Sequence, residues 1–264
     1  MACSHFHRHV YRTYGWGMSM LEGEFFNLLE TSESRWTTLV LEGRTWIDLE
    51  RSRRAWQAQI NRMQASGESF AVLRSKSTKD QVAEAPNKVE PAELDNSWSL
   101  WVSPERRRAK FVVGDGPVDV VIEGSTFWSN GFGRSFTNGG RENVGHGQGE
   151  GQYLIETADY APLLRVEEIS EGMRLGRHTI EAKVTTLENT SSERGRDLHG
   201  LTTGDADYLE LSIDRERGIV LSVSSWYQGA VYRKVEVSRV EFDPIFAPEV
   251  FRIEPQFGDR WSLA

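Results

Sequence analysis

The sequence predicts a mainly β protein of the α+β class: a strongly curved antiparallel sheet, or half-barrel, with helices covering its concave face. From residue 97 onward the chain is a succession of short segments rich in β-branched and aromatic residues, which is typical of strands. Turn residues separate these segments at short intervals, and the strand–helix alternation that builds parallel sheets is absent. Two amphipathic stretches before residue 66 supply the helices.

The first helix is predicted over residues 18–30, where Leu21, Phe25 and Leu28 recur at intervals of four and three. The second is predicted over residues 51–65, because apolar residues form a stripe there with charges elsewhere. Glutamine and arginine alternate with apolar residues in that stretch, so a strand is its alternative. We expect the two helices to act as lids on the concave face.

About eight to eleven strands are expected, joined mostly by short connections. The candidate segments are residues 36–49, 69–74, 98–102, 109–113, 118–124, 126–130, 165–170, 178–187, 207–214, 218–227, 230–242 and 250–254. Gln228-Gly229 indicates a tight hairpin, and residues 214–218 indicate another turn.

Two polar stretches, 75–96 and the glycine-rich 130–151, are expected to be loops, and a short helix is expected around residues 160–164. Residues 1–17 are interpreted as an extension that does not join the fold. The rest of the chain, 18–264, is then expected to form one domain.

Composition excludes several classes of protein. The formal net charge is −8, which argues against a nucleic-acid-binding protein. Cys3 is the only cysteine, so disulfides within the chain and cysteine zinc sites are excluded. The sequence has no apolar run long enough to span a membrane and no signal peptide at its start. We therefore expect a cytoplasmic protein, or an extracytoplasmic one if the N-terminus has been processed.

Aromatic residues are frequent on the predicted strands and helices. They suggest a cavity for an apolar ligand, such as a lipid or acyl chain, on the concave face, although an ordinary aromatic-rich core needs the same residue types. The candidate ligand-binding residues are Trp36, Trp46, Trp56, Trp98, Trp101, Phe111, Phe127, Trp128 and Trp226.

Two loops carry histidine beside glycine and carboxylates. Their polar residues are His146 in one loop and Asp197, His199, Asp205 and Asp207 in the other. If the loops meet, these groups could form a metal-dependent or histidine-dependent catalytic site. The alternative is that they stabilise long turns. Their spacing matches no metalloprotease helix motif and no single loop supplies three ligands, so neither a metal nor a catalytic residue is assigned.

Other motifs predict no cofactor. The glycine-rich segment fits neither common phosphate-binding pattern, because Phe136 stands where the last glycine of one is needed. Residues 106–108 form a run of three arginines, which either contacts an anionic lipid or acidic partner or is a solvated turn.

Several segments resemble a known family. The residues that carry the resemblance are Leu175-Gly176-Arg177-His178 with the strand after it, Tyr208 to Asp214 with Gly218 closing the turn, Tyr227-Gln228-Gly229, Val235 to Val237, Phe242, Pro244 and Val250-Phe251. They resemble the LolA/LolB-like lipoprotein carriers and the RseB-like sensors that bind anti-sigma factors, and are closest to an uncharacterised actinobacterial-type group with this fold. The resemblance covers residues 18–257.

The resemblance implies a half-barrel and a non-enzymatic binding role. The leading hypothesis is a cavity for an apolar ligand. The alternative is a protein-interaction or sensor domain, in which the concave face is filled and an outer face docks a partner. An enzyme built on the histidine loops is the third hypothesis. The chain departs from the carriers in its glycine- and histidine-rich segments, 138–151 and 195–207.

Overall fold

The computed structural model describes residues 19–65, 91–113, 116–131, 133–138, 150–187, 201–202, 204–257 and 261–263. The expected extension at residues 1–17 and the expected strand at 69–74 lie outside these ranges. So does most of the predicted loop at 75–96; its last residues, from Glu93, belong to a strand.

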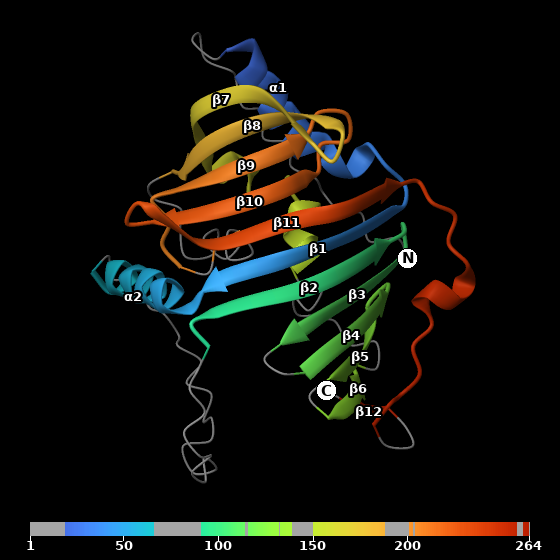
Figure 1. The fold of residues 1–264 in the computed structure, drawn as a ribbon. Helices are drawn as coiled ribbons and strands as arrows, with labels where there is room; N and C mark the ends of the chain where they lie inside the picture. Colours follow the sequence, from blue (N-terminus) through green and yellow to red (C-terminus); the bar gives the residue numbers. More distant parts are fainter. Residues whose placement is uncertain are drawn as a thin grey trace, which may run out of the picture.

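Within the described ranges, twelve strands form one sheet that is not closed into a barrel (Figure 1). The strands are β1 (Leu39–Asp48), β2 (Glu93–Val102), β3 (Arg106–Val113), β4 (Gly116–Glu123), β5 (Thr126–Gly131), β6 (Arg134–Thr137), β7 (Leu164–Arg174), β8 (Arg177–Thr186), β9 (Tyr208–Asp214), β10 (Val220–Tyr227), β11 (Ala230–Phe242) and β12 (Ser262–Leu263). Their order across the sheet is β12-β6-β5-β4-β3-β2-β1-β11-β10-β9-β8-β7. Every pair is antiparallel except β12 with β6, so the predicted fold class is confirmed.

The first and last long strands of the chain meet in the middle of the sheet, where β1 pairs with both β11 and β2. Side chains alternate between the two faces along each strand. We call inner the concave face that carries Leu41 and Leu100, which are paired across β1 and β2 and buried. The opposite face is called outer.

The helices are two α-helices, α1 (Met20–Thr31) and α2 (Leu49–Ala65), and four short 3-10 helices, η1 (Ser32–Ser34), η2 (Glu150–Leu154), η3 (Ala161–Leu163) and η4 (Pro248–Phe251). Ser19 begins α1 by accepting a hydrogen bond from the backbone N–H of Glu22 at 3.1 Å. In the apolar stripe predicted for α1, Phe25 and Leu28 are buried and Leu21 is half-buried, and the neighbouring Leu29 is fully inaccessible.

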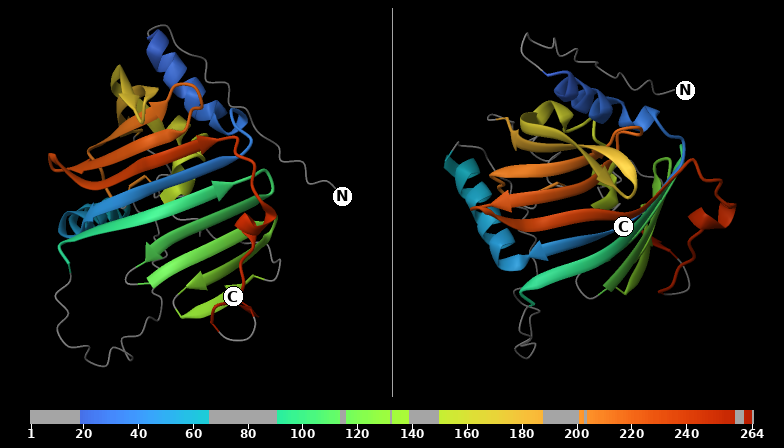
Figure 2. Two further views of the ribbon diagram at one scale, coloured as in Figure 1. Left: turned by 45° about the vertical axis from the view of Figure 1, so that its right-hand side comes forward. Right: turned by 45° about the horizontal axis from the view of Figure 1, so that its top comes forward.

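The concave face is covered mainly by α1 and by the segment that contains η2 and η3. Helix α1 packs against β7 and η3, whereas η2 packs against β1, β2 and β10 (Figure 2). Helix α2 lies against β1 and β11 at one end of the strands, and of its described side chains only Ala55 is buried. The second predicted lid therefore covers less of the face than the 3-10 segment does.

Two local predictions were wrong, one at residues 250–254 and one in the glycine-rich segment. Residues 250–254 form no strand, because the carbonyls of Val250 and Glu254 accept from the side chains of Arg108 and Asn130 and not from a neighbouring strand. The short helix expected around residues 160–164 is confirmed as the 3-10 helix η3, and β7 begins directly after it at Leu164. The glycine-rich loop contains strand β6.

Candidate binding site

The aromatic residues predicted to bind a ligand do not share one face of the sheet. On the inner face, Trp98 is opposite Gly43, Phe111 is opposite Val118 and Phe127 is opposite Ile122. The outer face carries Trp46, Trp101, Trp128 and Trp226. Trp56 lies on α2 and is partly exposed, and Trp36 lies between η1 and β1. These residues therefore do not line a common cavity.

The outer aromatic residues have partners on their own face. The indole N–H of Trp46 donates to Glu93 at 2.9 Å, and the ammonium of Lys110 lies 5.9 Å from the ring centroid of Trp101. Trp226 stacks on Tyr208 with ring centroids 5.2 Å apart. These rings stabilise the outer surface of the sheet.

On the inner face, Trp98 is enclosed by two glycines. A Cβ on Gly43 would lie 2.2 Å from the Trp98 ring, and a Cβ on Gly151 of η2 would lie 3.0 Å from it. Only residues without a side chain allow β1 and η2 to approach the indole this closely. The ring is 4% exposed, so the chain itself occupies the space above the central strands.

The rest of the concave face above the central strands is also filled by side chains of the chain itself. One hydrophobic cluster contains inner-face residues of β1, β2 and β8–β11 together with residues of α1 and of the η2–η3 segment. Leu154, Ile155 and Leu163 of that segment are buried in it. In the part of the chain that the structure describes, the concavity above these strands is filled by protein. A smaller cluster of Val118, Val120 and Ile122 continues the inner face on β4.

The polar loop candidates are only partly placed. His146, Asp197 and His199 lie outside the described residues, so whether the two loops meet stays untested. Asp205 forms an ion pair with Arg62 of α2, and burial raises the pKa of its carboxyl. The Asp207 carboxylate accepts from the backbone N–H of Gly229 at 3.4 Å. Both aspartates thus hold neighbouring segments, and no cluster of three potential metal ligands occurs among the described residues.

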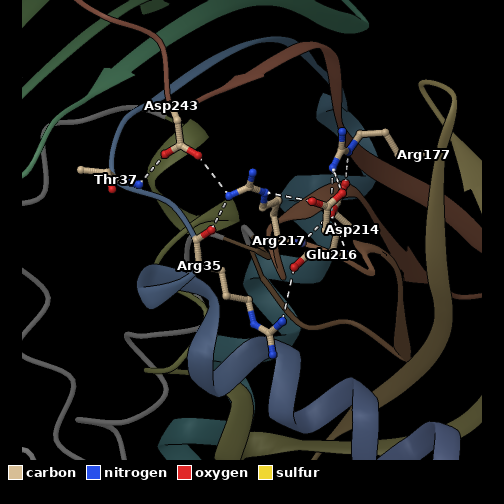
Figure 3. A network of polar contacts seen from close by, with 7 residues as sticks. All are labelled: Arg35, Thr37, Arg177, Asp214, Glu216, Arg217 and Asp243. Carbon is tan, nitrogen blue, oxygen red and sulfur yellow. Dashed lines mark hydrogen bonds and ion pairs between the residues drawn. The ribbon is translucent and has the colours of Figure 1, made fainter.

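A network of buried and half-buried charges lies where β9 turns into β10 (Figure 3). The carboxylate of Asp214 is fully buried; it accepts from the Arg177 guanidinium and from the backbone N–H groups of Glu216 and Arg217 at 3.0 and 2.7 Å. We call the residues Thr37, Arg177, Asp214, Arg217 and Asp243 the clasp.

The clasp also ties the turn to the ends of the central strands. Arg217 donates to the carboxylate of Asp243 at 3.1 Å and to the backbone carbonyl of Arg35 at 2.7 Å. Asp243 accepts from the backbone N–H of Thr37 at 2.8 Å, and this hydrogen bond lowers the pKa of the Asp243 carboxyl. Asp243 has a φ of 56°, a conformation that aspartate tolerates better than most residues.

Phe242 joins the two arginines of the clasp. The guanidinium carbons of Arg177 and Arg217 lie 4.9 and 5.1 Å from its ring centroid, within cation–π range. Arg177, Asp214 and Phe242 belong to three separate segments on which the sequence resemblance rests. The structure brings these segments together, so those residues stabilise the fold. Their meeting was not visible from the sequence.

Beside the clasp is a hollow of about 600 Å³. Four segments line it: Ser34 to Thr38 before β1, Ser103 and Arg106 at the β2–β3 turn, Arg217 after β9, and Asp243 to Phe246 with Phe251 after β11. Ile245 at its rim is fully exposed. The predicted aromatic residue that the hollow contains is Trp36. The sequence analysis did not identify Arg35, Arg217 and Asp243 as site residues. The feature that could have indicated them is that each is a charged residue close to the end of a strand.

The arginine run at 106–108 is not a solvated turn, because all three residues belong to β3. Arg107 pairs with Glu156 next to η2, and Arg108 forms a double hydrogen bond with Asp119 at 2.9 and 2.6 Å. Arg106 instead lies over the ring of Phe251, 5.0 Å from its centroid. The three arginines therefore have three different environments, and Arg106 is the one that lines the hollow.

Comparison with solved structures finds several similar chains at low sequence identity. MucB, known from Pseudomonas aeruginosa, is 12% identical with a TM-score of 0.47; the match covers 88% of this chain and 62% of the MucB chain. A conserved uncharacterised protein from Thermus thermophilus is 10% identical, with coverage of 89% and 94% and a TM-score of 0.44. A LolA superfamily protein from Nitrosomonas europaea is 6% identical, with coverage of 89% and 99% and a TM-score of 0.29.

The MucB and LolA superfamily proteins belong to the groups that the sequence resemblance names. The chain spans less than two thirds of the MucB chain. No family model matches this chain, and no curated protein matches it. Among the described helices, none has the length and apolar character needed to cross a membrane.

Proposed function

We propose that this chain is a non-enzymatic binding module that holds a segment of another protein in the hollow beside the clasp. The observation that carries the proposal is the contrast between the concave face of the sheet and the ends of its central strands. The inner face above the central strands is filled by α1, η2 and η3, whereas the hollow at the strand ends is open and lined by polar and aromatic side chains.

The contrast favours the interaction hypothesis over the apolar-ligand hypothesis. An acyl chain needs an apolar cavity that excludes water, and the concavity at Trp98 is already closed by Gly151. Ile245 is fully exposed at the rim of the hollow, where it is available as an apolar contact for a partner. The MucB structures include complexes with MucA, and a protein partner is the corresponding proposal here.

The proposal includes the compartment. We assign the chain to the extracytoplasmic location that the sequence left as its alternative, in place of the cytoplasm. One similar structure is described as a putative outer membrane lipoprotein-sorting protein, which fits such a location. Fractionation of the native host, with the protein detected by antibody, tests this part of the proposal.

A photo-crosslinking residue in place of Ile245 tests the binding surface. The matched control carries the same residue in place of Met20, which is also exposed but starts α1. We expect a crosslink from position 245 to one defined segment of one protein, and none from position 20. Equal crosslinking from both positions would contradict a specific surface.

Native mass spectrometry of the gently purified protein, followed by organic extraction, tests the alternative that the protein binds a lipid or another apolar ligand. The expected mass is that of the polypeptide alone. An excess mass that extracts as lipid would overturn the protein-segment proposal in favour of the apolar ligand.

A further inference from the structure

The side chain of Arg106 is held in place without using its hydrogen-bond donors. Its guanidinium lies over the Phe251 ring at 5.0 Å, and Phe251 in turn packs edge-on against Phe246, with centroids 5.3 Å apart. Stacking fixes the plane of a guanidinium but leaves its N–H groups available at the edge. No acceptor for those N–H groups occurs among the described residues, and Arg106 is half-buried, so its N–H groups are orientated and available to a ligand.

Arg35 is the second cation of the hollow that has no carboxylate partner in the described chain. It donates from Nε to the Thr31 hydroxyl at 2.8 Å and from one Nη to the backbone carbonyl of Glu216 at 3.3 Å. The one carboxylate in the lining belongs to Asp243, and it is already engaged by Thr37 and Arg217. Figure 3 shows the Arg35 guanidinium turned toward α1 and Glu216 and away from Thr37 and Asp243. Arg35 therefore adds positive charge beside the hollow, and the free donors in the lining belong to Arg106.

An excess of positive charge is unusual within the molecule. The chain carries a net charge of −8, and most described arginines have an acidic partner, as Arg44, Arg108 and Arg239 do. Arg35, Arg106 and Arg134 have no ion pair among the described residues, and of these three Arg35 and Arg106 line the same hollow. An anionic group placed there would gain charge-assisted hydrogen bonds that the protein itself does not provide.

The rest of the lining selects among anions. Trp36, Phe246 and the exposed Ile245 add apolar surface next to the two arginines. A small inorganic anion would leave that apolar surface exposed to water. An extended peptide can place an acidic side chain on the arginines and apolar side chains on the apolar surface at the same time. On the basis of the proposed function, we propose that the hollow binds a carboxylate side chain of the partner segment, flanked by apolar residues.

The test uses the full chain and a fluorescein-labelled peptide of alternating glutamate and phenylalanine. A second peptide has glutamine in place of glutamate. The protein variants are Arg106→Gln and, as matched control, Arg134→Gln on β6, an exposed arginine outside the hollow. Because the backbone N–H of Arg106 bonds to Ser103, the first variant keeps its turn, which thermal unfolding verifies.

Fluorescence anisotropy should show that the glutamate peptide binds the wild type roughly tenfold or more tightly than the glutamine peptide. Arg106→Gln should remove most of that preference, and Arg134→Gln should leave it intact. Added salt should weaken binding of the glutamate peptide only.

The other outcomes separate the two proposals. Equal binding of both peptides, unchanged by Arg106→Gln, would overturn the carboxylate inference but leave a peptide-binding module. Displacement of the glutamate peptide by inorganic phosphate at equal concentration would show a site for small anions and would also overturn the inference. Binding to vesicles of anionic lipid with no binding of either peptide would overturn both proposals, and binding of no probe would overturn the carboxylate inference.

Discussion

Arg177 donates to a carboxylate, that of Asp214, which has no solvent-accessible surface. Arg177 is the first residue of β8 and Asp214 is the last residue of β9. Their side chains face one another beside the turn that leads from β9 to β10. A buried carboxylate needs both a counter-charge and hydrogen-bond donors, and here the arginine and two backbone N–H groups provide them. The pair therefore anchors the clasp.

Replacing Asp214 with alanine should be strongly destabilising. The change leaves Arg177 without its buried partner and two backbone N–H groups of the turn without their acceptor. We expect a loss of about 3–5 kcal/mol in the free energy of unfolding, measured by urea denaturation. The control is Arg165→Ala, which breaks a surface pair with Glu167 and should cost less than about 1 kcal/mol. Similar losses for both variants would contradict the anchoring role.

Replacing Gly43 with alanine should lower the free energy of unfolding, and replacing Gly23 with alanine should raise it. At Gly43 the new methyl group would meet the Trp98 ring and the backbone carbonyl of Glu236 at 2.5 Å or closer, so stability should fall by about 1–3 kcal/mol. At Gly23, inside α1, no atom lies within 4 Å, and alanine should raise stability by about 0.5–1 kcal/mol. Urea denaturation of both variants measures the difference, and a stabilising Gly43→Ala would show that Trp98 is not enclosed.

Asp243 should contribute to stability in a pH-dependent way. Its folded-state pKa is lowered by the hydrogen bond from Thr37, so its contribution is present above the unfolded pKa, about 3.9. The contribution is lost as the pH falls through the folded-state value. The variant Asp243→Asn would keep an acceptor for Thr37, and asparagine tolerates the positive φ, but its side chain does not ionise.

The stability difference between the wild type and Asp243→Asn should therefore shrink when urea denaturation is repeated at successively lower pH, from neutral to below pH 4. A difference that stays constant over this range would mean that Arg217 and Thr37 do not stabilise the ionised form.

Ser135 should hold the C-terminal segment on the outer face. Its buried hydroxyl accepts from the backbone N–H groups of Gln256 and Phe257 at 3.0 and 2.9 Å and donates to Asn130 at 2.6 Å. Ser135→Ala removes all three hydrogen bonds, and we expect a loss of about 1–3 kcal/mol. Amide hydrogen exchange should be faster at residues 254–257 and unchanged in β9 and β10. Unchanged exchange at the C-terminal segment would refute this role.

Local patterns were reliable where neighbours in sequence decide the structure. Gln228-Gly229 forms the predicted hairpin turn, with φ values of 51° and 72°, because its geometry depends on those residues alone. The stripe of α1 was likewise visible in its spacing. The apolar pattern at 250–254 misled because its backbone bonds go to side chains of β3 and β5, which lie more than a hundred positions away in the chain.

The sequence by itself determined a curved antiparallel sheet with an apolar inner face, since side-chain alternation and turn residues act over a few positions. Only the tertiary structure decided which face each tryptophan occupies, because shifting the pairing register by one residue reverses the faces. It also decided that Gly151 closes the space at Trp98 and that Arg35, Arg106 and Arg217 line one hollow. Such contacts join distant segments, and they form only when the whole sheet assembles.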